Sequence, residues 1–223
     1  ADSTPAADPE SPVPYVVKGQ VVNELGQPLA GVMVYADNTF VYDSWIEGVT
    51  DQQGKYELQL PNIAASYRMG AIYETELDGE TVPFHFDPEP NAAFGSNEGA
   101  IRNFVLDINK GTIQIYEYDY YDDEDAPDVS LPDIEFTLQS VGQLVDGSSD
   151  RTIITSPSKK SLTVEEIPIG TYELSAVWKP KDYKEVPMLV RVRFTDEYKD
   201  KVTISFENTF LDVFVAQIDL TFP

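Results

Sequence analysis

The feature that most constrains this chain is an alternation of apolar and polar residues with a period of two. Residues 134–141 read IEFTLQSV, which places Ile134, Phe136 and Leu138 on one face of an extended strand. Residues 55–61, KYELQLP, follow the same pattern. No segment shows a sustained apolar period of 3.6 residues, so we expect helices to be scarce. The sequence therefore predicts an all-β fold.

Turn signals separate the strands. Gly26 and Pro28 mark a tight connection, and the polar run TDQQG marks another, in which Asp51 is expected to bond backbone amides and Gly54 to end the turn. The predicted strands cover 16–22, 32–35, 39–45, 55–61, 67–74, 81–86, 101–108, 111–118, 134–141, two stretches within 161–178, 188–194, 201–206 and 210–222.

The chain divides into three predicted parts. Residues 1–14 hold four prolines among small and acidic residues, which predicts a flexible tether; the alternative is a frayed terminus or a cloning remnant. The turn signal NKG follows a terminal strand, and we place a domain boundary there, giving domains at 15–108 and 109–223. The pattern G-x-Y-E-L occurs at 54–58 and 170–174, as expected of two copies of one sandwich. We predict two tandem antiparallel β-sandwich domains.

The charge balance narrows the partners. The sequence has 15 basic and 39 acidic residues, and the resulting net charge of −24 disfavours nucleic acid and anionic lipid. The absence of Cys removes disulfides and thiolate chemistry. No apolar run reaches the roughly 20 residues that span a bilayer. Because the chain opens at Ala1 and not at Met, we expect either a processed or a trimmed form, and any signal peptide or lipid-anchored Cys would lie upstream of Ala1.

The first half carries a familiar series of motifs. The segments VKGQVVNELGQPLAGVMVYADN and GVTDQQGKYELQLP resemble the carboxypeptidase regulatory-like domain, a transthyretin-like β-sandwich. The resemblance covers about residues 15–61 and implies a structural, non-catalytic domain over 15–108. The positions that match that family's pattern are Gly19, Gly26, Pro28, Leu29, Gly31, Val32, Thr50, Asp51, Gly54 and Tyr56.

The second half is similar, more loosely, to the prealbumin-like B-type repeat domains of Gram-positive adhesins and pilins, through IEFTL and IPIGTYELSAVWKP. Some of those domains carry a Lys-to-Asn crosslink. Here Tyr116 and Tyr118 stand where that family has Lys, and Ala176 and Val177 where it has Glu, so we expect no crosslink. The combination of both halves also resembles secreted proteins of Bacteroidota. These resemblances imply a bacterial envelope protein that is secreted, periplasmic or at the cell surface.

Catalytic chemistry finds little support in the residue pattern. His85, the one His, lies in VPFHFDP, where alternation places it opposite Phe84 and Phe86. No G-x-S-x-G elbow accompanies it, and no glycine-rich phosphate loop follows a strand. We expect His85 to be a surface strand residue. We therefore predict that the chain is not an enzyme and holds no catalytic set or organic cofactor.

An acidic run at 117–128, EYDYYDDEDAPD, is the best candidate for an ion site. Calcium takes 6–8 oxygen ligands, and Asp119, Asp122, Asp123 and Asp125 are the proposed ligands. The run lacks the spacing of an EF-hand loop. The competing interpretation is a solvated hairpin loop that binds nothing.

Aromatic residues offer a second kind of site. Tyr118, Tyr120 and Tyr121 alternate with acids in the same run and are candidate glycan contacts, because rings stack on sugars while carboxylates bond hydroxyl groups. Phe40, Tyr42 and Trp45, in the strand predicted at 39–45, form a second aromatic set. The alternative is that strand aromatics pack in the core or across strands.

Two surface features suggest protein contacts. Edge strands of a sandwich can accept a strand from a partner. Arg191 and Arg193 form a basic spot in an acidic protein, suited to the chain's own acidic run or to a partner.

The sequence thus predicts a non-catalytic, exported structural, adhesive or accessory binding module of the bacterial cell envelope, with a protein or glycan partner at the cell surface. The alternative is a carbohydrate- or calcium-binding module that serves a larger surface system. Enzyme chemistry by paired carboxylates is the third interpretation.

Overall fold

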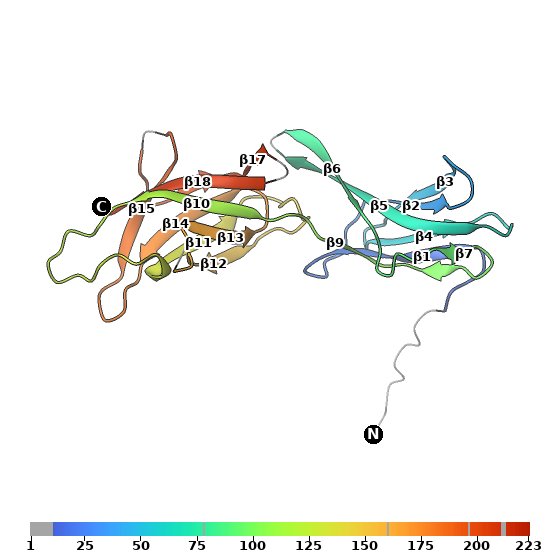
Figure 1. Cartoon of the computed structure of the whole chain (residues 1–223), viewed down its shortest axis with the longest axis horizontal. Coiled ribbons are helices and arrows are strands. Elements are labelled where there is room, and N and C mark those ends of the chain that lie inside the picture. The colour runs from blue at the N-terminus through green and yellow to red at the C-terminus, as the bar shows by residue number, and fades with distance from the viewer. Residues whose placement is uncertain (1–10, 78, 160, 196, 211–212) are drawn as a thin grey trace, which may run out of the picture. The chain divides into compact units, whose positions relative to one another are not determined.

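The computed structural model describes residues 11–77, 79–159, 161–195, 197–210 and 213–223. The chain divides into two compact units, Ala1–Asp107 and Ile108–Pro223, at a point one residue from the predicted boundary. Residues 1–10 of the predicted tether lie outside the described residues. Strands dominate both units, and one short 3-10 turn, Leu131–Asp133, is the helical element among the described residues. The prediction of an all-β fold is confirmed (Figure 1).

One sheet of unit 1 is built on its first strand, β1 (Val16–Asn23). On one side β1 pairs antiparallel with β4 (Lys55–Gln59). It also pairs in parallel with β8 (Ala100–Ile101) and β9 (Phe104–Leu106). The strand predicted at 101–108 is therefore broken into two short pieces that both follow β1.

The other sheet of unit 1 has the strand order β3-β2-β5-β6. Its strands are β2 (Met33–Asn38), β3 (Trp45–Val49), β5 (Ser66–Leu77) and β6 (Glu80–Phe86), with β7 (Phe94–Gly95) on β5. Every pairing within this sheet is antiparallel. Alternating side chains of both sheets point inward and form one apolar core. Its members include Val17, Val21, Val34, Ala36, Leu58, Tyr67, Met69, Ala71 and Phe104.

The turn between β3 and β4 behaves as its sequence predicts. The Asp51 carboxylate accepts hydrogen bonds from the backbone N–H groups of Gln53, at 2.9 Å, and Lys55, at 2.8 Å. Gly54 has a φ of +69°, and a Cβ there would lie 2.4 Å from the carbonyl oxygen of Val21. Both the left-handed backbone and the close approach require glycine. The stretch GVTDQQGKYELQLP is therefore a corner of the scaffold.

Unit 2 contains nine strands among its described residues. They are β10 (Gly111–Tyr118), β11 (Ile134–Ser140), β12 (Thr152–Thr155), β13 (Thr163–Ile167), β14 (Tyr172–Trp178), β15 (Val186–Val192), β16 (Val202–Ile204), β17 (Glu207–Phe210) and β18 (Val213–Thr221). Four of the largest fully buried side chains are Phe136, Tyr172, Trp178 and Phe206. Unit 2 thus has an aromatic-rich core of its own.

One strand joins the two layers of unit 2. The first part of β15, Val186 to Met188, pairs with β14, whereas Leu189 to Val192 pair with β18. The path β12-β11-β14-β15-β18-β10-β13 is therefore continuous, and the layers share a strand. Unit 2 therefore has two layers, as predicted, but they share a strand, whereas the two sheets of unit 1 do not.

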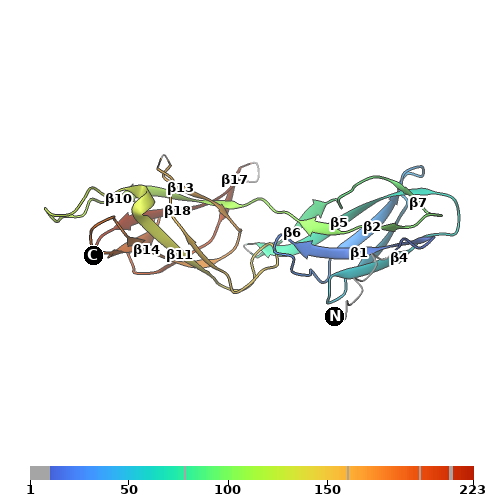
Figure 2. The same cartoon turned by 90° about the horizontal axis from the view of Figure 1, so that it is seen from below.

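The sheets depart from a purely antiparallel arrangement where each unit closes. β1 pairs in parallel with β8 and β9, and β10 pairs in parallel with β18 (Figure 2). In both cases the first strand of a unit lies beside strands from its end. A parallel pair needs a long crossover connection, and the rest of the unit supplies it.

The two G-x-Y-E-L segments occupy different places. The first lies on β4, at the edge of its sheet, and the second on β14, between β11 and β15. The tyrosines of both segments nevertheless have the same role, since each donates its hydroxyl group to a backbone carbonyl. The hydroxyl of Tyr56 donates to the carbonyl of Arg102 at 2.6 Å, and that of Tyr172 to the carbonyl of Pro168 at 2.7 Å. Burial raises the pKa of both hydroxyls. The Tyr56 hydroxyl therefore binds a backbone carbonyl and does not face water.

Candidate functional site

The prediction of a strand at 39–45 is wrong: residues 39–44 form a loop, and this loop lines the main candidate site. The loop forms because the side-chain oxygen of Asn38 accepts hydrogen bonds from the N–H groups of Phe40, at 2.9 Å, and Val41, at 3.2 Å. The N–H of Asn38 donates to the carbonyl of Ser44 at 2.9 Å and closes the loop. Asp43 adopts a φ of 57°. These bonds hold the loop in one shape.

The loop presents its apolar side chains to solvent. Phe40 is 80% exposed, Tyr42 98% and Trp45, at the start of β3, 53%. Together with the outward side chains of β2, β3 and β5, they line an open groove of about 930 Å³, called here the loop groove. Sequence reasoning missed the groove because an apolar run was assigned to a strand. The available signal was the run FVY between Asn38 and Asp43, two residues that favour turns.

A tyrosine forms the floor of the loop groove. Tyr35 on β2 pairs with Gly70 on β5. A Cβ at Gly70 would lie 2.3 Å from the Tyr35 hydroxyl oxygen, so the tyrosine side chain lies directly over the glycine. Gly70 is buried although its neighbours Arg68 and Ile72, on the same face of the sheet, are not. Because Gly70 has no side chain, the ring of Tyr35 can pack flat against the surface of the sheet at that position.

The loop groove is acidic. Three carboxylates line it, from Asp37, Asp43 and Glu47, against the single guanidinium of Arg68. Arg68 on β5 lies opposite Asp37 on β2 in the register of the two strands. The indole N–H of Trp45 donates to Glu47 Oε2 at 3.2 Å, which orients the ring. Such a surface can place rings against a ligand and carboxylates around it.

The acidic run belongs to unit 2, and its centre packs against other residues of that unit. The ring centre of Tyr121 lies 5.6 Å from that of Trp178 and 4.9 Å from that of Phe222. Asp123 accepts a hydrogen bond from the Tyr183 hydroxyl at 2.6 Å and lies 3.6 Å from Lys184 Nζ. The Tyr183 bond, the Asp125 amide and Lys184 lower the pKa of Asp123.

The proposed calcium ligands are not brought together. Asp119 accepts a hydrogen bond from the Thr221 hydroxyl, Asp123 faces Tyr183, and Asp122 and Asp125 are exposed. Across the described residues, no group of three or more His, Asp or Glu side chains has the geometry of a metal site. Calcium binding by the run stays a prediction.

The proposed glycan contacts also separate. Tyr121 belongs to the aromatic cluster with Trp178, Tyr183 and Phe222. Tyr120 is exposed, and Tyr118 at the end of β10 is partly exposed. Only Tyr118 and Tyr120 thus present rings to solvent, and glycan binding there stays a prediction.

The basic spot belongs to a buried ion cluster. Asp219 on β18 is 1% exposed, and its Oδ2 lies 2.8 Å from Arg191 Nη2. Its Oδ1 lies 3.5 Å from Arg193 Nη1. Arg191 lies over the ring of Tyr198 and Arg193 over that of Tyr116, which covers the carboxylate. Asp219, which sequence reasoning did not single out, is therefore the partner of both arginines.

His85 is an exposed residue of β6, as expected.

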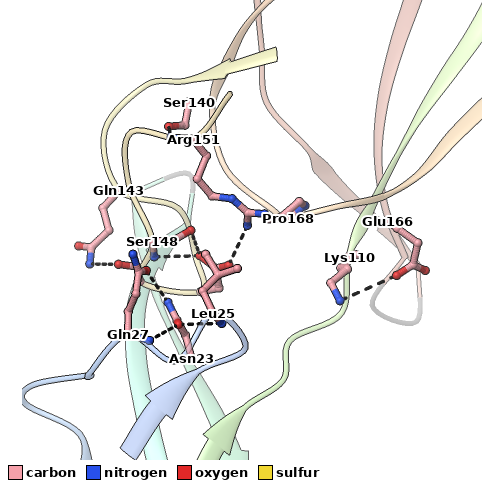
Figure 3. A network of polar contacts seen from close by, with 12 residues as sticks. Asn23, Leu25, Gln27, Lys110, Ser140, Gln143, Ser148, Arg151, Glu166 and Pro168 are labelled. Carbon is pink, nitrogen blue, oxygen red and sulfur yellow. Dashed lines mark hydrogen bonds and ion pairs between the residues drawn. The ribbon is translucent and has the colours of Figure 1, made fainter. Parts of the chain in front are cut away.

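The other buried polar side chains fasten turns. In unit 1 the Asn23 side-chain oxygen accepts from the N–H groups of Leu25 and Gln27, each at 3.0 Å (Figure 3). In unit 2 one carboxylate oxygen of Asp146 accepts from the Ser148 N–H at 2.9 Å, and the other lies 3.4 Å from Arg151 Nη1 (Figure 3). Within each unit these side chains thus bond to backbone N–H groups or to a neighbouring side chain of the same turn.

Comparisons with known proteins give distant likenesses. No protein-family model and no curated protein matches the sequence. Similar solved structures include the TIE protein of Bacillus anthracis, at 16% identity and a TM-score of 0.44, over 96% of this chain and 34% of that one. The minor pilin GBS52 of Streptococcus agalactiae is 14% identical with a TM-score of 0.28, over 94% of this chain and 96% of that one.

A C-terminal fragment of the pilus adhesin SpaC from Lactobacillus rhamnosus GG is 12% identical with a TM-score of 0.34, over 93% of this chain and 98% of that one. The chain thus spans about a third of the length of the Bacillus protein. Similarity at this level does not identify a function. Among the described residues no helix has the length and apolar character needed to cross a membrane.

Proposed function

We propose that this chain is a non-catalytic structural, adhesive or accessory binding module, exported to the bacterial cell envelope. Recognition takes place on the outside of a β-scaffold. In this proposal the loop groove is the contact surface of unit 1, and the partner is a protein at the cell surface.

The observation that carries the proposal is the role of the buried polar side chains. Among the described residues the buried indole N–H of Trp178 and Oδ1 of Asp219 have no hydrogen-bond partner, although Arg193 Nη1 lies 3.5 Å from the latter. Seven buried polar side chains each have a structural partner: a backbone group, a neighbouring turn residue or an arginine. They are Asn23, Thr50, Ser96, Ser140, Asp146, Ser148 and Asp219. Hydrogen bonds of this kind hold strands and turns in place. By contrast, the rings of Phe40, Tyr42 and Trp45, which line the loop groove, are exposed to solvent.

A second candidate function is carbohydrate binding, favoured by the same exposed rings. Aromatic faces stack on sugar rings, and carboxylates and tyrosine hydroxyls bond sugar hydroxyls. The Tyr35 hydroxyl is protonated at neutral pH and can donate a hydrogen bond to a sugar. Burial, with Asp87 and Asp37 nearby, raises its pKa further.

Binding arrays test the proposed function. We expect the labelled chain to bind immobilised envelope or matrix proteins saturably, and Tyr42→Ala to weaken that binding. Tyr120→Ala is the control, because it removes another largely exposed tyrosine ring, 80% exposed against 98% for Tyr42, from unit 2. Retained glycans with no retained protein would favour the carbohydrate function instead. Turnover of glycoside, ester or peptide substrates that one carboxylate substitution abolishes would contradict a non-catalytic role.

A further inference from the structure

We infer that the loop groove binds an extended cationic peptide segment, whose Arg or Lys side chains lie against the exposed rings and between the carboxylates. This inference deepens the proposed function, on which it rests, by naming the chemistry of the partner. It is carried by three features of the groove: exposed rings, excess negative charge and a fixed loop.

The exposed rings are the first feature. Phe40, Tyr42 and Trp45 show most of their surface to solvent, whereas other aromatic residues of this chain are buried in the core of their unit. Burying apolar surface contributes roughly 25 cal/mol per Å², so leaving three rings exposed forgoes stability. Contiguous exposed apolar patches on soluble proteins commonly mark binding surfaces.

The charge of the groove is the second feature, and it selects the ligand. Asp37, Asp43 and Glu47 outnumber Arg68, the one cation among the described lining residues. The whole chain carries a net charge of −24, so its field attracts cations and repels acidic polymers. A neutral sugar gains nothing from this field. A guanidinium group satisfies both properties of the surface, since it stacks on rings and forms bidentate bonds with carboxylates.

The protein uses the same pairing elsewhere. Arg193 lies 3.4 Å from the ring centre of Tyr116, and Arg191 lies 4.5 Å from that of Tyr198. Both arginines also lie close to the carboxylate of Asp219. That cluster is an intramolecular version of the proposed contact. In the loop groove the rings and carboxylates come from this chain, and the additional cations would come from the partner.

The fixed loop is the third feature. Asn38 Oδ1 accepts hydrogen bonds from the N–H groups of Phe40 and Val41, and the N–H of Thr39 donates to the carbonyl of Ser66 at 2.9 Å. Tyr35 rests against Gly70 and forms a preformed floor. A surface that is ordered before binding loses less conformational entropy when the ligand arrives.

The two tryptophans make a direct test available. Trp45 lies in the loop groove, whereas Trp178 is fully buried in unit 2. The probe is the capped peptide Gly-Arg-Gly-Arg-Gly, compared with its Gln-for-Arg analogue and with a neutral cello-oligosaccharide. We expect saturable quenching or a shift of the Trp45 emission with the Arg peptide only, absent in Trp45→Phe. Raising the salt from 50 to 300 mM should weaken binding at least threefold.

Paired variants separate a specific site from general attraction to an acidic protein. Asp37→Asn with Glu47→Gln removes two carboxylates from the groove, and we expect about a tenfold loss of affinity, equal to about 1.4 kcal/mol. Asp122→Asn with Asp125→Asn removes the same charge from the exposed acidic run, and we expect less than a twofold change. Titrations of both double variants followed by calorimetry avoid dependence on fluorescence.

A third variant tests the floor. Gly70→Ala places a methyl group where the Tyr35 hydroxyl lies and lifts that ring into the groove. We expect at least a threefold loss of peptide affinity with the Trp45 emission of the free protein still that of an exposed ring.

Several results would overturn the inference. Equal losses in the two double carboxylate variants would show charge attraction without a site. Binding of the oligosaccharide but not the peptide would assign the groove to sugars. No binding of the Arg peptide, together with retained protein binding on the arrays, would reject this inference while leaving the proposed function in place. Loss of both would reject the proposed function as well.

Discussion

Single tyrosines fasten the backbone at a corner of each unit. Tyr56 and Tyr172 bury their rings and donate their hydroxyl groups to backbone carbonyls. The G-x-Y-E-L pattern predicts the buried ring from alternation, since Tyr, Leu and the following apolar residue share a face. The carbonyl that accepts the bond is not predictable, because Arg102 is 46 residues from its tyrosine.

Removing one of these hydroxyl groups should lower stability. Tyr172→Phe leaves the buried carbonyl of Pro168 without its donor, and we expect a loss of about 1–2 kcal/mol in the free energy of unfolding. Urea unfolding of the full chain measures it. Tyr120→Phe, on an exposed ring, is the control and should change stability by less than about 0.5 kcal/mol. An equal effect of both substitutions would contradict the assigned role.

Asp123 gives a pH dependence whose sign follows from its partners. The hydrogen bond from Tyr183, then the Asp125 amide and Lys184, lower its pKa below the ordinary value of 3.8. A carboxyl whose folded pKa is depressed stabilises the fold above the unfolded pKa and loses that contribution as pH falls through the folded pKa.

We therefore expect Asp123→Asn to reduce stability at neutral pH, with the difference from the unsubstituted chain vanishing in acid. Urea midpoints between pH 7 and pH 2 test this. The neighbouring exposed carboxyl gives the control Asp122→Asn, which should show no comparable convergence. A deficit of Asp123→Asn that persists unchanged at the acid end would show that the charge is not involved.

Among the elements, turns decide where the strands begin and end. The β3–β4 turn follows from Asp51 and Gly54, and the sequence locates it correctly. The β2–β3 loop does not follow from alternation, since Phe40, Val41 and Tyr42 resemble a strand when read by residue type alone. Asn38 overrides that preference by bonding two backbone N–H groups.

Two glycines test this view of the turns. Gly54→Ala adds a methyl group 2.4 Å from the Val21 carbonyl oxygen at a φ of +69°, and should cost about 2–4 kcal/mol. Gly26→Ala has a similar φ of +74° but open space around it, so it should cost about 1 kcal/mol. Denaturant unfolding of both variants separates the contact from the backbone strain. Equal costs would mean that the approach to Val21 is relaxed without penalty.

At the scale of the whole molecule, local sequence patterns predict where strands lie but not which strands pair. Alternation locates β11 and β14 and the inward side chains of both. It does not predict that β15 pairs with β14 at one end and β18 at the other, because partner choice depends on strands far away in the chain. Nor does it predict the burial of Asp219, whose position in the alternation is outward and which Arg191 and Arg193 cover. The loop groove likewise depends on a loop that residue type misassigns.

The central structural claim is that each unit has a complete core of its own. Separate expression of residues 11–107 and 108–223, followed by urea unfolding monitored by circular dichroism, tests it most directly. We expect both fragments to give β-type spectra and a single cooperative transition, with a slope of about 1–2 kcal/mol/M as for small domains. A fragment that is unfolded on its own, or that unfolds without cooperativity, would contradict the claim.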